Sequence, residues 1–238
     1  MSSEGLDGVT VAIAGAAGGL GPVVCERLAG AGANLALTDR SDERLAEVAR
    51  DLDLPAERVD TQVVDLLDPE AAAGWARALG ERFGGVDALL HLVGGWRGGE
   101  PLATAALDDY EFLHDLLVRT LQHTTRAFRD QLADSGRGRF VLISSSQAQR
   151  PGGKNAAYGA AKAAAESWTL ALADDLAHTG ATSNIIVVEA ILTPRMRLEN
   201  PGKEYPSFTP AEQIADAISF LLSDGAEHMN GQRLSLHS

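Results

Sequence analysis

Short apolar runs rich in β-branched residues alternate with longer helical patterns along the whole 238-residue chain. Strands are expected at 9–15, 34–40, 58–66, 86–95, 138–146, 181–190 and 231–238. Helices are expected at 19–32, 42–52, 69–84, about 108–135, 156–178 and 209–224. Unbroken apolar strands that alternate with helices indicate a parallel sheet covered on both faces, so the chain predicts an α/β fold with a doubly wound sheet of about seven strands. No linker or repeat divides the series, and residues 1–238 are expected to form a single domain.

The composition argues against several classes of partner. The net charge of −13 disfavours nucleic acid and anionic membrane surfaces, which both select basic proteins. No stretch reaches the roughly 18 apolar residues of a membrane span, and the first residues, MSSEGLDG, lack the pattern of a secretory signal. The single cysteine, Cys25, rules out an intramolecular disulfide and fits a reducing cytoplasm, where we expect this protein. The six histidines lack metal-ligand spacing, so no metal is expected.

A cluster of glycines follows the first expected strand and opens the first expected helix. In a doubly wound sheet, ligands bind beyond the carboxyl ends of the strands, and glycines at this turn let a pyrophosphate approach the backbone at the helix N-terminus. A turn that needs positive φ would account for one glycine more easily than for four. The context therefore predicts a dinucleotide-binding Rossmann fold, with cofactor contacts at Gly15, Ala17, Gly19, Leu20 and Gly21.

An acidic residue, Asp39, ends the second expected strand, where a carboxylate can accept hydrogen bonds from the adenosine ribose hydroxyls. Because a carboxylate repels a 2′-phosphate, Asp39 favours NAD over NADP. The neighbouring Arg40 could instead pair with that phosphate, and both cofactors stay open. Asp65 and Leu66 end the third expected strand and are placed to meet the adenine, although a turn-forming Asp explains this position nearly as well.

Ser145, Tyr158 and Lys162 are the candidate catalytic residues. Tyr158 and Lys162 are four residues apart in an expected helix, so the phenol and the ammonium lie on one face. Ser145 ends the preceding strand and can reach the same point. Together they offer a proton donor, a cation to tune it, and a hydroxyl to hold a carbonyl oxygen. The Tyr-x-x-x-Lys spacing alone also arises often by chance.

Taken together, these residues resemble the short-chain dehydrogenase/reductase family over nearly the whole chain. The family's turn, Thr-Gly-x-x-x-Gly-x-Gly, matches residues 14–21 except that Ala14 replaces Thr. Its catalytic Ser precedes the Tyr by thirteen residues, as Ser145 precedes Tyr158. The order, the spacing and the pattern of elements coincide, and that combination is specific.

The resemblance implies an NAD(P)-dependent oxidoreductase that moves a hydride between nicotinamide and the carbon of a small carbonyl or alcohol. Tyr158 would be the general acid or base, and Lys162 together with the positive nicotinamide ring would lower its pKa. Lys162 would also bind the nicotinamide ribose, and Ser145 would hold the substrate oxygen. Gly94 would let the backbone pass the cofactor, and Ile191 and Thr193 keep the spacing of a nicotinamide-carboxamide contact.

The chain also departs from the family pattern in several other places. The usual Asn-Asn-Ala-Gly after the fourth strand is His91-Leu92-Val93-Gly94. The usual Pro-Gly after the sixth strand is Val188-Glu189. Many members also have a catalytic Asn that helps connect the Lys to solvent, but this chain has no Asn between Asn34 and Asn155. Its place falls near Leu117 to Arg119, where His114 or Arg119 could substitute.

Weaker signals concern the substrate and the assembly. Trp96, Gln147 and Arg195 are candidates for the substrate pocket, and residues 193–208 are expected to form a mobile loop over it. The Ala-rich helix at 156–178 resembles the helix through which family members form dimers or tetramers, although intrachain packing explains it as well. The competing hypothesis is an impaired relative that binds nucleotide in a regulatory role. A sugar-nucleotide epimerase is disfavoured, because little chain follows the sixth strand.

Overall fold

Seven parallel strands form one sheet in the computed structural model, which describes residues 5–236. Their order is β3-β2-β1-β4-β5-β6-β9, so the chain reverses direction across the sheet between β1 and β4. The strands are β1 (Thr10–Ala14), β2 (Asn34–Asp39), β3 (Val59–Val63), β4 (Ala88–His91), β5 (Arg139–Ser145), β6 (Thr182–Val188) and β9 (Arg233–Ser235). The doubly wound α/β fold is therefore confirmed, with strands somewhat shorter than the apolar runs that predicted them.

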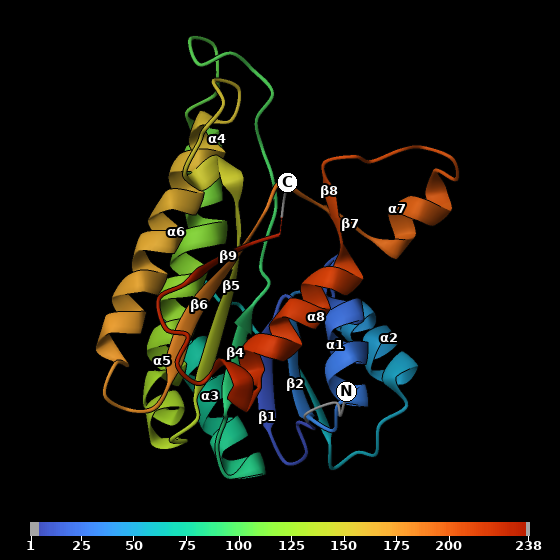
Figure 1. Ribbon diagram of the computed structural model, residues 1–238, viewed down its shortest axis with the longest axis vertical. Helices are drawn as coiled ribbons and strands as arrows, with labels where there is room; N and C mark the ends of the chain where they lie inside the picture. The colour runs from blue at the N-terminus through green and yellow to red at the C-terminus, as the bar shows by residue number, and fades with distance from the viewer. Residues whose placement is uncertain (1–4, 237–238) are drawn as a thin grey trace.

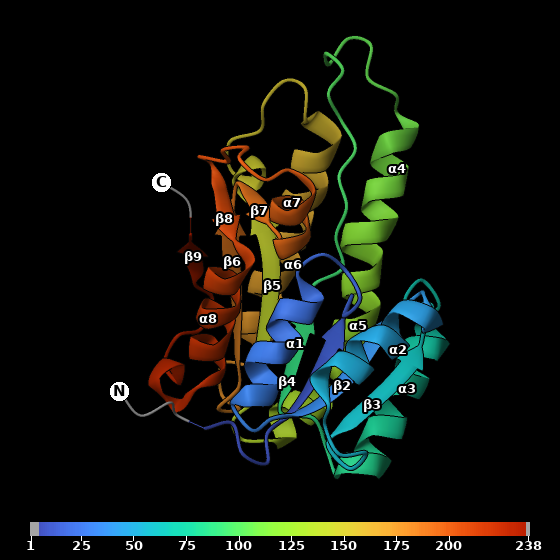
Figure 2. The same cartoon turned by 90° about the vertical axis from the view of Figure 1, so that its right-hand side faces the viewer.

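Helices cover both faces of this sheet, as the two views in Figures 1 and 2 show. One face carries α1 (Gly21–Gly30), α2 (Asp42–Leu52) and α8 (Ala211–Leu222). The other carries α3 (Pro69–Phe83), α5 (Thr120–Asp134) and α6 (Ala156–Asp175). Each layer buries a hydrophobic core of its own, because the strands present apolar side chains on both faces.

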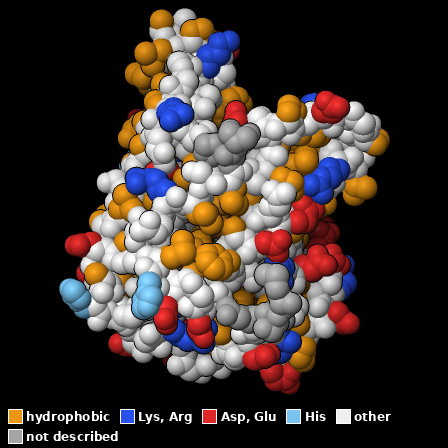
Figure 3. Space-filling model, in the orientation of Figure 1, with side chains coloured by type: hydrophobic (Ala, Val, Ile, Leu, Met, Phe, Trp, Pro, Cys, Tyr) orange, Lys and Arg blue, Asp and Glu red, His pale blue; other side chains and the backbone are white. Residues whose placement is uncertain are grey.

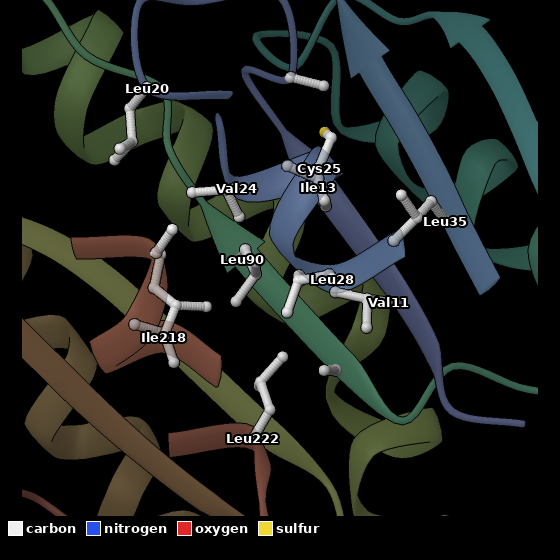
Figure 4. Packing of buried hydrophobic residues seen from close by; sticks show 14 of the residues in the cluster. Val11, Ile13, Leu20, Val24, Cys25, Leu28, Leu35, Leu90, Ile218 and Leu222 are labelled. Atoms are coloured by element: carbon white, nitrogen blue, oxygen red, sulfur yellow. The ribbon is translucent and has the colours of Figure 1, made fainter. Parts of the chain in front are cut away.

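The core beneath α1 and α8 shows why the sequence selects this arrangement. Val11 and Ile13 alternate with residues of the opposite face along β1, while Val24 and Leu28 lie one turn apart on α1. These side chains interdigitate with Ile218 and Leu222 of α8 (Figure 4). This packing fixes the N-terminus of α1 at the carboxyl end of β1.

Two segments differ from the predicted elements. The long helix expected at about 108–135 is divided into α4 (Asp108–His114), a π-helical turn at Asp115–Arg119, and α5. The expected loop at 193–208 contains α7 (Pro194–Glu199), and a second small sheet pairs β7 (Ala190–Leu192) with β8 (Phe208–Pro210). The segment expected as a mobile loop therefore contains a short helix and is anchored at both ends by the pairing of β7 with β8.

Candidate active site

A cavity of about 1060 Å³ lies at the carboxyl ends of β1, β2, β4, β5 and β6. The molecule is notched at this end between the column that carries α4 and the lobe that carries α7 (Figures 1 and 3). Most of the predicted site residues line the cavity: Gly15, Gly19, Leu20, Asp39, Arg40, Asp65, Leu66, Gly94, Trp96, Ser145, Gln147, Tyr158, Lys162, Ile191 and Thr193. Ala17, Gly21 and Arg195 are not among its lining residues. The sheet thus gathers into one place residues that are far apart in the sequence.

The three candidate catalytic residues meet on one wall of this cavity. Ser145 is the last residue of β5, and its Oγ accepts a hydrogen bond from the Gln147 backbone N–H at 3.3 Å. The Lys162 ammonium is buried, donates to the Ile143 carbonyl oxygen at 2.8 Å, and lies 6.0 Å from the centre of the Tyr158 ring. The helix spacing and the strand end therefore deliver the phenol, the ammonium and the hydroxyl to one point.

Burial is the main influence on the pKa values of Tyr158 and Lys162. It raises the pKa of Tyr158, and a hydrogen bond with Ser145 acts in the opposite direction. It lowers the pKa of Lys162 to about 8, while the negative charge of Glu166 acts to raise it. The residues of the chain alone therefore do not lower the pKa of Tyr158. At neutral pH its phenol is protonated and can act as an acid.

Two glycines are required in this turn because other backbone atoms lie very close to their Cα atoms. Gly15 has a φ of 87°, and a Cβ there would lie 2.8 Å from the backbone nitrogen of Val93, two residues after β4. A Cβ on Gly21 would overlap the Ala16 carbonyl oxygen. A Cβ on Gly19 would lie 3.2 Å from the Thr193 methyl group and would narrow the cavity. The glycines at 15 and 21 fix the turn, and Gly19 keeps the space in front of it open.

The Asp39 carboxylate lies at the end of β2 beside this turn. It accepts hydrogen bonds from the Ala17 and Arg40 backbone nitrogens at 3.1 and 2.7 Å. Arg44 of α2, which sequence reasoning missed, also lines the cavity and hydrogen-bonds the Ala17 carbonyl. Asp65 accepts from the Leu67 backbone nitrogen at 3.0 Å, so it forms a turn and lines the cavity at once.

The place of the missing Asn is apolar. Leu117 lies within the π-helical turn and is buried against α6. His114 and Arg119 lie 3.9 and 3.2 Å from the Asp115 carboxylate, and neither lines the cavity. Neither is therefore placed to substitute for the Asn.

His91 fills the space behind this turn instead. Its Nε2 and Nδ1 lie 3.3 and 3.2 Å from the hydroxyls of Thr120 and Thr124, and Thr120 lines the cavity. Burial, assisted by the charge of Lys162, lowers the pKa of His91 to about 3, so the imidazole is neutral. Sequence reasoning noted His91 only as a departure from the family pattern. The i, i+4 spacing of the two threonines was the signal available for this contact.

The outer end of the cavity is mostly apolar. Trp96 donates from Nε1 to the Asn155 side-chain oxygen at 3.0 Å, and Phe112 and Leu116 lie in the same wall. Gln147 accepts from the Gly152 backbone nitrogen at 2.8 Å. Arg195 instead projects from α7 and pairs with Glu199 at 2.6 Å.

Residues 5–236 contain neither a metal-binding cluster nor a membrane-spanning helix. No group of three or more His, Cys, Asp or Glu residues in that range could hold a metal ion. None of the helices in that range is long and apolar enough to cross a membrane.

Comparisons with known proteins agree with this geometry. A family model described as enoyl-(acyl carrier protein) reductase matches residues 15–237. Sulfoacetaldehyde reductase 2 of Chromohalobacter salexigens is 30% identical over 235 residues, which cover 95% of this chain and 92% of that protein. The solved structure of a glucose/ribitol-type short-chain dehydrogenase/reductase from Brucella melitensis is 29% identical, with a TM-score of 0.84 over 99% of this chain and 97% of that one. The chain therefore belongs to the short-chain dehydrogenase/reductase family.

Proposed function

We propose that this protein is an NAD(P)-dependent oxidoreductase that interconverts a small-molecule carbonyl and the corresponding alcohol, with Tyr158 as the general acid or base. The observation that carries the proposal is the convergence of Ser145, Tyr158 and Lys162 on the cavity that also contains the glycine turn. A proton donor is thereby placed in the same space as a site suited to a dinucleotide.

The residues at the inner end of the cavity fit a dinucleotide. Gly19 leaves open the space opposite Thr193 that a side chain would narrow, and the N-terminus of α1 favours the pyrophosphate charge. We propose NAD as the preferred cofactor, because the Asp39 carboxylate would accept from the ribose hydroxyls and repel a 2′-phosphate. Arg40 and Arg44 line the same region and would favour the 2′-phosphate of NADP. The preference for NAD therefore depends on Asp39.

Residues of the chain itself would transfer the proton and stabilise the charge that remains. When bound, the nicotinamide supplies the hydride in reduction and accepts it in oxidation. Tyr158 would donate its phenolic proton to the carbonyl oxygen, and Ser145 would donate a hydrogen bond to the same oxygen as its charge develops. Lys162 would stabilise the phenolate that remains and hold the nicotinamide ribose.

The substrate would enter between the apolar outer wall and α7. Trp96 and Gln147 line this end and are the proposed substrate contacts. Arg195 is paired with Glu199 at the surface of α7 and does not line the cavity. Ala160 and Ala163 are exposed on α6, which fits a proposed homodimer or homotetramer that packs through this helix.

Two measurements test the proposal in sequence. Calorimetric titration should first show tighter binding of NADH than of NADPH, and the reverse order would overturn the cofactor assignment. A panel of carbonyls and alcohols, followed at the NADH absorbance, should then identify a substrate. Tyr158→Phe should bind NADH nearly as wild type does but lose at least ~10²-fold in turnover, because the proton donor is gone.

Two outcomes would count against the assignment. Turnover that survives Tyr158→Phe would show that another group transfers the proton. Tight NADH binding without turnover across a broad panel would favour the nucleotide-binding, regulatory alternative, which the absence of the family's Asn and Pro-Gly motivates.

A further inference from the structure

A buried carboxylate lies one helical turn beyond Lys162. Glu166 of α6 is 2% exposed, and both of its oxygens are bonded. Oε1 accepts from the Ser144 hydroxyl at 2.7 Å. Oε2 accepts from Arg233 Nε at 2.6 Å and from the Gln149 side-chain amide at 3.4 Å. A carboxylate that is removed from water this completely has a specific environment built around it.

These partners come from separate parts of the fold. Ser144 precedes Ser145 on β5, Gln149 follows the short turn after β5, and Arg233 lies on β9 at the edge of the sheet. Glu166 therefore connects the helix of Tyr158 and Lys162 to the strand of Ser145 and to the last strand of the chain. Figure 1 shows β9 at the edge of the sheet beside β6.

The charges around Lys162 make Glu166 electrostatically important. Tyr158 on α6 is protonated, and His91 on β4 is neutral at pH 7. Glu166 is the charged group whose field acts on Lys162 to favour the ammonium, and Glu166 is itself paired with Arg233 of β9. The Ile143 carbonyl holds the ammonium from β5 without a net charge.

We propose that Glu166 is a positioning residue of this site: it fixes the end of β5 through Ser144, and it supplies the negative charge that the buried Lys162 ammonium requires. The assignment deepens the proposed function and rests on it only for the catalytic readout. The electrostatic part concerns Lys162 itself and is measured without any substrate.

The chain offers a direct probe, because Lys154, Lys162 and Lys203 are its only lysines. The full-length protein is labelled with ¹³Cε-lysine, its three resonances are assigned with Lys→Arg variants, and each is titrated by NMR. Lys162 should titrate near pH 8, well below the ~10.4 of an exposed lysine. In Glu166→Gln, which keeps the shape and can still accept from Ser144, the midpoint should fall by about one pH unit.

The direction of the shift separates charge from structure. A variant that merely loosens the site would hydrate Lys162 and move its midpoint upward, whereas loss of a nearby negative charge moves it downward. Asp175→Asn is the matched control, because it removes one negative charge from the same helix at an exposed position paired with Arg129. Its Lys162 midpoint should equal that of wild type. An unchanged or raised midpoint in Glu166→Gln overturns the proposal.

Two further measurements cover the remaining outcomes. If Glu166→Gln does not fold, the double variant Glu166→Gln/Arg233→Met removes both ions of the buried pair and leaves neither uncompensated. Its Lys162 midpoint should still fall, because Glu166 is the group whose charge favours the ammonium, and an unchanged or raised midpoint would overturn the proposal. Once a substrate is known, the alkaline limb of the rate profile should move with the NMR midpoint in Glu166→Gln. A shifted midpoint in a protein without turnover would leave the role of Glu166 intact and contradict only the proposed function.

Discussion

His91 is an imidazole that the fold keeps neutral. It is 1% exposed, its two ring nitrogens meet two threonine hydroxyls, and the nearby Lys162 adds to the cost of a second positive charge. The unfolded chain has no such constraint, so His91 there titrates near its ordinary pKa. Protons therefore favour the unfolded state over the pH range between the two values.

We predict that His91 makes the protein sensitive to acid. Its folded pKa of about 3 lies below the ordinary 6.5, so the unfolded chain binds a proton first as the pH falls. The stabilisation is full above pH 6.5 and is lost below it at up to about 1.4 kcal/mol per pH unit. His91→Gln keeps a neutral polar side chain and lacks this titration. The free energy of unfolding of both proteins is measured with urea at pH 7.5, 6.5, 5.5 and 4.5. The excess of wild type over His91→Gln should decrease as the pH falls, and an excess that stays constant would contradict the prediction.

Some of the site residues could be predicted from the sequence, and others could not. Tyr158 and Lys162 were predictable because one helical turn fixes their relation, and Ser145 because a strand end precedes that helix. Glu166 could not be predicted because its role depends on Arg233, which is 67 positions away in the sequence. Only the parallel pairing of β6 with β9 brings Arg233 close to Glu166. Arg44 was missed for the same reason, since its partner Ala17 belongs to another element.

At the scale of elements, the N-terminus of α1 depends on one glycine. Gly21 begins the helix and is buried against the Ala16 carbonyl, so the helix axis passes close to the turn that precedes it. A methyl group there must push the helix away from the end of β1. That displacement would also move the backbone N–H groups that face the cavity.

We predict that Gly21→Ala lowers the free energy of unfolding by roughly 1–3 kcal/mol and weakens NADH binding. Gly30→Ala at the other end of α1 is the control, because a Cβ there meets nothing within 4 Å. It should be neutral or stabilising by up to about 1 kcal/mol, since alanine restricts the unfolded chain. Urea unfolding and calorimetric titration with NADH check both variants, and equal effects at the two positions would refute the argument.

The segment after β6 shows why some elements escaped prediction. The Pro/Gly punctuation near Pro201 resembles a loop, yet Thr193 caps α7 by accepting from the Met196 backbone nitrogen, and Pro194 opens that helix. The pairing of β7 with β8 joins two runs of three residues each, and neither run has an apolar pattern long enough to predict a strand. A parallel pair this short is set by the positions of β6 and α8 at its two ends, which periodicity does not encode.

At the scale of the whole molecule, the two cores beneath the two helical layers share the same seven strands. Cys25 is fully buried in the core beneath α1, where Figure 4 shows it beside Ile13. Burial raises the pKa of its thiol to about 12, so the native state offers no reactive thiolate. Cys25 can react only when α1 leaves the sheet, and the cofactor site at the N-terminus of α1 would be lost in the same event.

We therefore predict that NADH protects Cys25 from an aromatic disulfide reagent. When opening is fast relative to labelling, the rate follows the population of the open state, which a ligand reduces by the factor 1 + [L]/Kd. NADH at 100 times its measured Kd should slow labelling about 100-fold. Cys25→Ser, which contains no thiol, gives the background rate. A labelling rate that NADH leaves unchanged would mean that α1 detaches around Cys25 while its N-terminus still binds the cofactor, and the helix would then not respond as one unit.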